Sequence, residues 1–131
     1  MIVIETSALI AIIEDEPEKA RFLQVIADDG SARMSAVSLL EAGMVVRSRR
    51  GEKGIDQLYS LLLAMHIMIV PFDEANARAA ILAFDKYGKG MGTAAKLNLG
   101  DCASYALAKM LNVPLLFKGD DFKATDIFAA V

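Results

Sequence analysis

The chain has 131 residues, of which 55% are hydrophobic, and its formal net charge at pH 7 is −3. This length suits one domain with a single buried core, and we predict one domain over residues 1–131. No apolar run reaches the roughly 18 to 20 residues that span a bilayer, which excludes a membrane-spanning helix. The lone Cys102 excludes an internal disulfide, and a signal-peptide pattern is missing, so we expect a cytoplasmic protein.

The first part of the chain alternates β-rich runs with helical patterns. Met1–Ile4 is apolar without alternation, which is typical of a strand covered on both faces. In chain order we predict a strand at 1–4, a helix to residue 13 capped by Thr6 or Ser7, a helix at 17–29, a strand at 32–35 and a helix at 38–50 that Gly51 ends.

The second part repeats the alternation of helix and strand. We predict a helix at 55–66, a strand at 67–70, a helix at 74–87, a glycine-rich basic loop at 88–92, a helix at 100–112 and a strand at 114–117. Parallel neighbouring strands need a helical crossover between them. The order therefore predicts an α/β fold, with a mostly parallel central sheet flanked by helices as an α/β/α sandwich.

Acidic residues follow the first and last predicted strands. Glu5 comes directly after the first strand, and Asp120 comes shortly after the last. In open parallel sheets the binding crevice lies beyond the carboxyl ends of the strands. Glu41 and Asp101, in the opening turns of two helices, are placed to face the same rim. We therefore expect these four acids to converge.

Each acid also has a purely structural interpretation. Ser38-x-x-Glu41 is a capping-box pattern, Asp101 after Gly100 is an ordinary N-cap candidate, and Asp120 with Asp121 suits a turn. Glu5 fits such a role least well, because an acid beside a buried strand carries a desolvation cost unless it is paired or bound to a cation.

Four converging carboxylates would repel one another unless a cation neutralises them. An all-oxygen cluster suits Mg²⁺ or Mn²⁺ and not zinc. Such a metal activates water and offsets charge on a leaving oxygen, which is the chemistry of phosphodiester hydrolysis. The sole histidine, His66, ends an apolar helical stretch and is interpreted as a packing or surface residue, and Cys102 as helix packing.

Basic residues form local patches in a chain of low net charge. Such patches can hold a phosphate backbone, although solvated helix ends and loops give the same pattern. The residues that we single out for RNA binding are Arg49, Arg50, Lys89, Lys96 and Lys118.

Taken together, several motifs resemble a PIN-domain ribonuclease of the VapC toxin type. They are the apolar strand that ends in Glu5-Thr6-Ser7, the Ser38-x-x-Glu41 helix start, residues 97–102 (LNLGDC) and residues 115–122 (LLFKGDDF) with Thr125-Asp126-Ile127. The resemblance covers essentially the whole chain. It implies a Mg²⁺- or Mn²⁺-dependent endoribonuclease that cuts structured RNA such as transfer or ribosomal RNA. It also implies a homodimer, and a complex with a small VapB-like antitoxin that inhibits it.

The resemblance also assigns residue roles. The four family acids fall on Glu5, Glu41, Asp101 and Asp120, with Asp121 as the alternative to the last. The hydroxyl that helps to order metal-bound water falls on Thr6, beside Ser7, and Asn98 is placed to support Asp101.

Two positions depart from the family pattern. The first acid is ordinarily aspartate, and Met91-Gly92 stands where relatives often carry Arg-His. Glu5 moves its carboxylate outward by roughly 1.5 Å, whereas Mg²⁺ demands oxygen distances of about 2.0 to 2.1 Å. The alternative function is therefore a weakened PIN domain that binds antitoxin or RNA without cleaving it. A phosphoryl-accepting signalling domain is a further alternative, but a lone acceptor aspartate with a matching lysine is missing.

Overall fold

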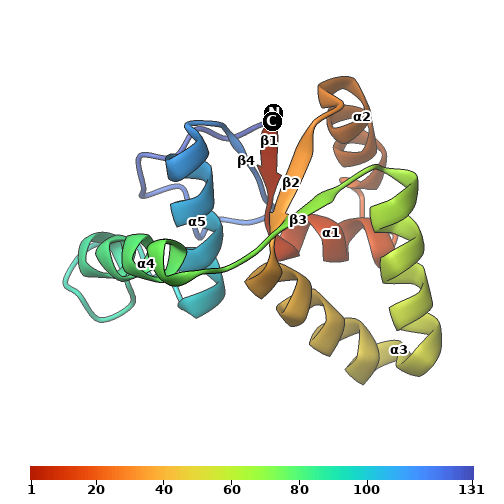
Figure 1. The fold of residues 1–131 in the computed structure, drawn as a ribbon, viewed down its shortest axis with the longest axis horizontal. Coiled ribbons are helices and arrows are strands. Elements are labelled where there is room, and N and C mark those ends of the chain that lie inside the picture. The colour runs from red at the N-terminus through yellow and green to blue at the C-terminus, as the bar shows by residue number, and fades with distance from the viewer.

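The structure is a computed structural model that describes all 131 residues. Its four strands form one sheet in the order β3-β2-β1-β4, and every pair of neighbours is parallel (Figure 1). The strands are β1 (Ile2–Ile4), β2 (Ala32–Ser35), β3 (Met68–Val70) and β4 (Leu115–Leu116). Val3 lies opposite Arg33 on one side and Leu115 on the other, so β1 is a central strand.

Five helices connect and cover the strands. They are α1 (Thr6–Ile13), α2 (Lys19–Asp29), α3 (Ala36–Ala64), α4 (Glu74–Tyr87) and α5 (Leu99–Leu111). The long α3 is interrupted at Gly51, whose φ of 64° is not helical, and Figure 1 shows its two arms meeting at an angle. The predicted break between two helices is thereby confirmed.

The helices lie on both faces of the sheet, with α1, α2 and α3 on one side and α4 and α5 on the other (Figure 1). Alternate residues of β1 serve the two faces. Ile2 and Ile4 belong to the core formed with α1, α2 and α3, whereas Val3 packs in the core with α4 and α5. Val3 and Ile4 are fully buried. The predicted α/β/α sandwich is confirmed, including the strand that is covered on both faces.

The starts of α1, α2 and α3 differ from the predictions. The α1 helix is capped by Glu5 and not by Thr6 or Ser7, because the Glu5 side chain accepts the Ser7 amide. The α2 helix begins at Lys19, two residues after Pro17. The α3 helix begins at Ala36, where Ser35 accepts the Val37 amide.

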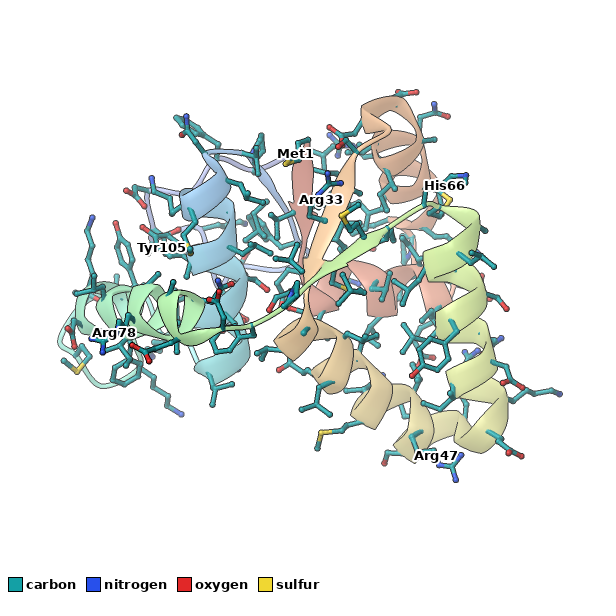
Figure 2. All side chains as sticks on the ribbon, viewed as in Figure 1. Met1, Arg33, Arg47, His66, Arg78 and Tyr105 are labelled. Carbon is teal, nitrogen blue, oxygen red and sulfur yellow. The ribbon has the colours of Figure 1, made fainter.

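The capping-box interpretation of Ser38 is therefore wrong. Ser38 lies inside α3, fully buried, and its hydroxyl is 2.8 Å from that of Ser104 on α5. This contact ties the start of α3 to α5 and fixes how the helices meet beside the carboxyl end of β1. His66 is exposed at the turn between α3 and β3, where Figure 2 labels it, in agreement with a surface role.

None of the helices combines the length with the apolar composition that crossing a membrane requires.

Candidate active site

A polar cavity of about 600 Å³ opens beyond the carboxyl ends of β1 and β4. This is the point in the sheet where the chain, having moved from β1 to β2 and β3, returns on the other side of β1 as β4. Crevices at such points are the usual ligand sites of open α/β sheets. Its acidic lining comes from α1, α3, α5 and the loops beside them: Glu5, Glu16, Glu41, Asp101 and Asp121.

Glu5 is fixed at the start of α1. One of its oxygens, Oε2, accepts the Ser7 amide at 2.7 Å and also the Ser7 hydroxyl. The Ser7 hydroxyl in turn accepts the backbone amide of Lys118 at 2.9 Å, which joins α1 to the loop after β4. Glu5 is only 4% exposed, and this burial raises its pKa to about 7 although the bonds from Ser7 oppose the shift. The charges of Asp101 and Glu41 raise it further.

Thr6 holds Glu41 and not Glu5. Its buried hydroxyl donates to Glu41 Oε1 at 2.6 Å, with a longer contact of 3.3 Å to the carbonyl oxygen of Ser38. A single hydroxyl from α1 therefore positions the carboxylate that α3 contributes. The role that the family resemblance gives to Thr6, ordering metal-bound water, stays a prediction.

Asp101 lies in the first turn of α5 and forms a capping box with Asn98. Asn98 Oδ1 accepts the Asp101 amide at 2.9 Å, and Asp101 Oδ2 accepts the Asn98 amide at 3.1 Å. Asn98, and not Asp101, is the N-cap residue. Burial raises the pKa of Asp101 to about 6, against the bond from Asn98, and the charges of Asp121 and Glu41 add to the rise. Asp101 thus combines a capping role with a place in the cavity.

The last acid of the set is better represented by Asp121 than by Asp120. Asp121 lines the cavity, whereas Asp120 does not, and the Asp120 side chain is 82% exposed. Asp120 instead pairs with Lys123 at 2.5 Å. Gly119, which has a positive φ of 98°, turns the chain between β4 and these two residues. The structure therefore brings together Glu5, Glu41, Asp101 and Asp121.

The donor chemistry of this cavity fits a hard divalent cation. The four acids offer only oxygen atoms, and two of them are buried with raised pKa values, as expected for carboxylates that lack a neutralising charge. No three of them lie close enough together to hold one ion among them. Mg²⁺ usually keeps several waters and takes only one or two protein carboxylates directly, so this spacing remains compatible with it.

The basic residues are arranged less simply than the sequence suggested. Arg49 lines the cavity, but Arg49 and Arg50 both pair with Glu14, at 3.4 and 3.0 Å. Lys118 also lines the cavity, and its ammonium group pairs with Glu16 and with Glu18, the latter at 3.2 Å.

Two other basic residues lie away from this cavity. Lys89 and Lys96 are exposed and do not line it. Glu16 also lines the cavity, although it is not among the acids predicted from the sequence. Its pairing with Lys118, about a hundred residues away, leaves no signal in a single sequence.

The sequence matches the PIN domain family over residues 2–127. It is 47% identical over 127 residues to a Ribonuclease VapC of Mycolicibacterium smegmatis, covering 97% of this chain and 98% of that one. It is also 45% identical over 125 residues to Ribonuclease VapC30 of Mycobacterium tuberculosis, covering 95% of each chain.

Solved structures agree on the fold. The crystal structure of Mycobacterium tuberculosis VapC20, described as a toxin that cleaves the sarcin-ricin loop, superposes with a TM-score of 0.80 at 15% identity, covering 100% of this chain and 98% of the other. VapBC2 from Rickettsia felis, bound to a promoter DNA fragment, gives a TM-score of 0.73 at 18% identity and covers 98% and 97%. The chain therefore belongs to the PIN domain family, and within it to the VapC ribonucleases.

Proposed function

We propose that this protein is a Mg²⁺- or Mn²⁺-dependent endoribonuclease toxin that a cognate VapB-like antitoxin neutralises. The observation that carries the proposal is the convergence of Glu5, Glu41, Asp101 and Asp121 on one polar cavity at the carboxyl end of β1. The names of the relatives support ribonuclease activity, and the toxin-antitoxin complexes among the similar structures support an antitoxin partner.

The residues of the cavity have different proposed roles. Glu5 and Asp101, buried and close to the strand ends, would hold the cation, with Asn98 orienting Asp101. A bound Mg²⁺ supplies an activated water and offsets negative charge on the leaving oxygen. Thr6 fixes one oxygen of Glu41, which leaves the other, Oε2, available to accept a proton from the attacking water. At the rim, Arg49 and Lys118 would bind RNA phosphates by exchanging the carboxylates with which they pair in the free protein.

The experiment is RNA cleavage by antitoxin-free protein. We expect cleavage with Mg²⁺ or Mn²⁺, no cleavage in EDTA, and loss of activity in Asp101→Asn. Asp56→Asn is the matched control, because Asp56 is an exposed acid on α3 outside the cavity. Cleavage that persists in EDTA, or an Asp101→Asn variant as active as Asp56→Asn, would contradict the proposal.

A weakened, binding-only domain is the alternative for this sequence, and the comparisons do not favour it, since the similar relatives carry the name ribonuclease. We propose instead that Glu5 reduces the rate without abolishing cleavage. The extra methylene lets the Glu5 carboxylate bend back onto Ser7 and remain inside the cavity. An antitoxin complex that forms normally while the free protein fails to cut any RNA would favour the binding-only alternative.

An apolar groove between the two arms of α3 supports the antitoxin proposal. Leu40, Met44 and Tyr59 line it and are each more than half exposed, and Arg47 adds a positive charge at its edge. Such a groove suits the apolar face of an amphipathic helix. We expect Met44→Glu to lose antitoxin binding, measured by calorimetry, while RNA cleavage by the free protein is retained. Unchanged antitoxin affinity in Met44→Glu would place the antitoxin elsewhere.

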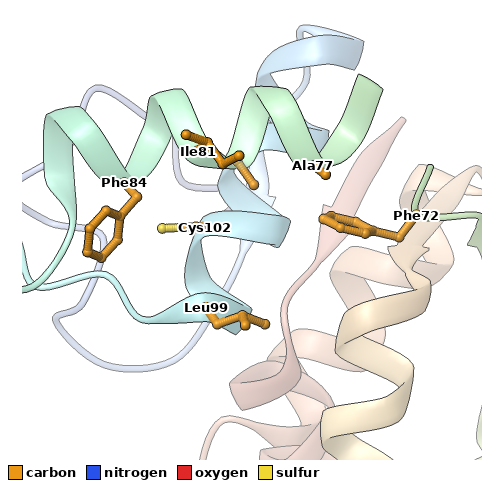
Figure 3. Close-up of a pocket in the computed structure, with 7 residues that line it drawn as sticks. Phe72, Ala77, Ile81, Phe84, Leu99 and Cys102 are labelled. Carbon is orange, nitrogen blue, oxygen red and sulfur yellow. The ribbon is translucent and has the colours of Figure 1, made fainter. Parts of the chain in front are cut away.

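A second apolar pocket supports the proposed homodimer. It lies between α4 and the start of α5, and Figure 3 shows Phe72, Ile81, Phe84 and Leu99 around it with the Cys102 sulfur at its floor. Ile81 is 61% exposed and Leu99 is 78% exposed. Neighbouring apolar side chains that are this exposed are unusual on the surface of a monomer. We expect Ile81→Glu to convert a dimer to a monomer in sedimentation velocity. A dimer that survives this substitution would exclude this face as the contact.

A further inference from the structure

Gly100, the second residue of α5, has no conformational need to be glycine. Its φ does not lie in the left-handed region, and it is buried inside an ordinary first helical turn. Glycine at a helical position costs roughly 0.5 to 1 kcal/mol relative to alanine. A reason for glycine here has therefore to come from space and not from the backbone.

One group, the Glu41 carboxylate, occupies the space that a side chain at position 100 would fill. A Cβ atom added to Gly100 would lie 2.6 Å from Glu41 Oε2, 2.7 Å from Oε1 and 2.8 Å from Cδ. These three atoms are the nearest to it, and all belong to the side chain that Thr6 holds. Because Gly100 has no side chain, the Glu41 carboxylate from α3 can lie directly against α5.

We propose that Gly100 is a positioning residue for the cleavage reaction, because the absence of a side chain at this position lets the Glu41 carboxylate lie beside Asp101. The inference rests on the proposed function and extends it by a residue that carries no functional group. This position also lies at the first turn of a helix of 13 residues, where unpaired amides and the helix dipole favour a negative charge. The cavity therefore depends on Gly100 for the relative placement of its α3 and α5 acids.

The nature of the obstruction predicts what a methyl group would do. The Glu41 carboxylate is the far end of a flexible, half-exposed side chain, so it can swing away without disturbing the core. Gly100→Ala should then fold, with Glu41 displaced and its bond from Thr6 broken. Glu41→Asp withdraws the carboxylate by one methylene, which removes most of the conflict with the new methyl group.

The test is a double-substitution cycle that measures Mn²⁺ affinity by calorimetry and RNA cleavage rate in the four proteins. Changing a residue that orients the functional side chains of a metal site typically costs about 10- to 100-fold. Because Glu41 acts on the attacking water while Glu5 and Asp101 hold the cation, we expect Gly100→Ala to lower the cleavage rate by this factor and to leave Mn²⁺ affinity nearly unchanged. In the Glu41→Asp background the same substitution should cost little, because residues in contact are not additive. A crystal structure of metal-free Gly100→Ala should show Glu41 more than about 3.5 Å from the Thr6 hydroxyl, beyond hydrogen-bond range.

Stability supplies an independent readout. Gly43→Ala is the matched control, because its Cβ would meet only Leu58 Cδ2 at 3.9 Å, and it should raise the melting temperature as alanine does in a helix. We expect Gly100→Ala to fold without this gain. If Gly100→Ala does not fold, a folded double variant with Glu41→Asp supports the proposal, and an unfolded double variant overturns it.

Equal losses of cleavage rate in both backgrounds, or a wild-type cleavage rate in Gly100→Ala, would also overturn the proposal. Failure of the proposed function is a separate result. In that case the unmodified protein itself would neither bind Mn²⁺ nor cleave RNA, whatever residue stands at position 100.

Discussion

The pH dependence of stability offers a direct measure of the electrostatic cost of Glu5. Its pKa rises from an ordinary value of 4.5 to about 7 in the folded protein, mainly because the side chain is buried. Between these two values the folded state keeps a proton that the unfolded state has lost. Stability therefore falls as pH rises through this window, since the unfolded state binds fewer protons than the native state.

The size of the effect follows from the shift. Each pKa unit corresponds to about 1.4 kcal/mol, so Glu5 should cost the metal-free protein of the order of 3 kcal/mol between about pH 4.5 and pH 8. Asp101, whose pKa is raised to about 6, shifts stability in the same direction. Glu5→Gln isolates the first contribution, because Gln does not ionise and can still accept the Ser7 amide.

The assay is urea unfolding at a series of pH values, in EDTA and in excess Mg²⁺. In EDTA, the unfolding free energy of the unmodified protein should fall relative to Glu5→Gln by about 2.5 kcal/mol from pH 5 to pH 8. A cation present at about 100 times its dissociation constant raises the unfolding free energy by about 2.7 kcal/mol. At pH 8 we expect this stabilisation in the unmodified protein only. A difference that stays constant with pH, or equal stabilisation of both proteins by Mg²⁺, would refute the reasoning.

Three further substitutions test the individual roles. Glu5→Asp shortens the side chain and removes one torsion, which lowers the entropic cost of ordering it by about 0.5 to 1.5 kcal/mol. We therefore expect a two- to tenfold higher cleavage rate. An unchanged or lower rate would show that the glutamate does not slow the reaction. Thr6→Val keeps the shape but frees Glu41, and should lower the rate about tenfold; a rate equal to that of the unmodified protein would remove Thr6 from the site. Asp121→Asn should lower Mn²⁺ affinity measured by calorimetry while Asp120→Asn leaves it unchanged, and the reverse order would restore Asp120 as the fourth acid.

The fold was largely predictable because the strands are short, three of them (β1, β3 and β4) are wholly apolar, and each is separated from the next by a helical pattern. Glu5 and Asp101 could be placed at the site from their positions after a strand and at a helix start. Gly51 could be predicted as a break, and its positive φ shows why only a glycine suits the bend. Periodicity and chain order were sufficient for these features, since they are local.

The remaining features depend on contacts between distant residues. Ser38 looked like a cap, but its hydroxyl contacts Ser104, which is 66 residues away. Whether Asp120 or Asp121 faces the cavity depends on how the chain turns at Gly119. A sequence pattern does not distinguish between two adjacent aspartates in such a turn. The seat for Glu41 at Gly100 joins α3 to α5, so no window of sequence contains both partners.

The central claim is that the cavity at the carboxyl end of β1 holds the divalent cation on which cleavage depends. The most direct measurement is anomalous scattering from a crystal of the antitoxin-free protein soaked in Mn²⁺. We predict an anomalous peak inside the cavity, within coordination distance of an oxygen of Glu5 or Asp101. A soaked crystal with no peak in this cavity, or with its only peak elsewhere on the protein, would contradict the account.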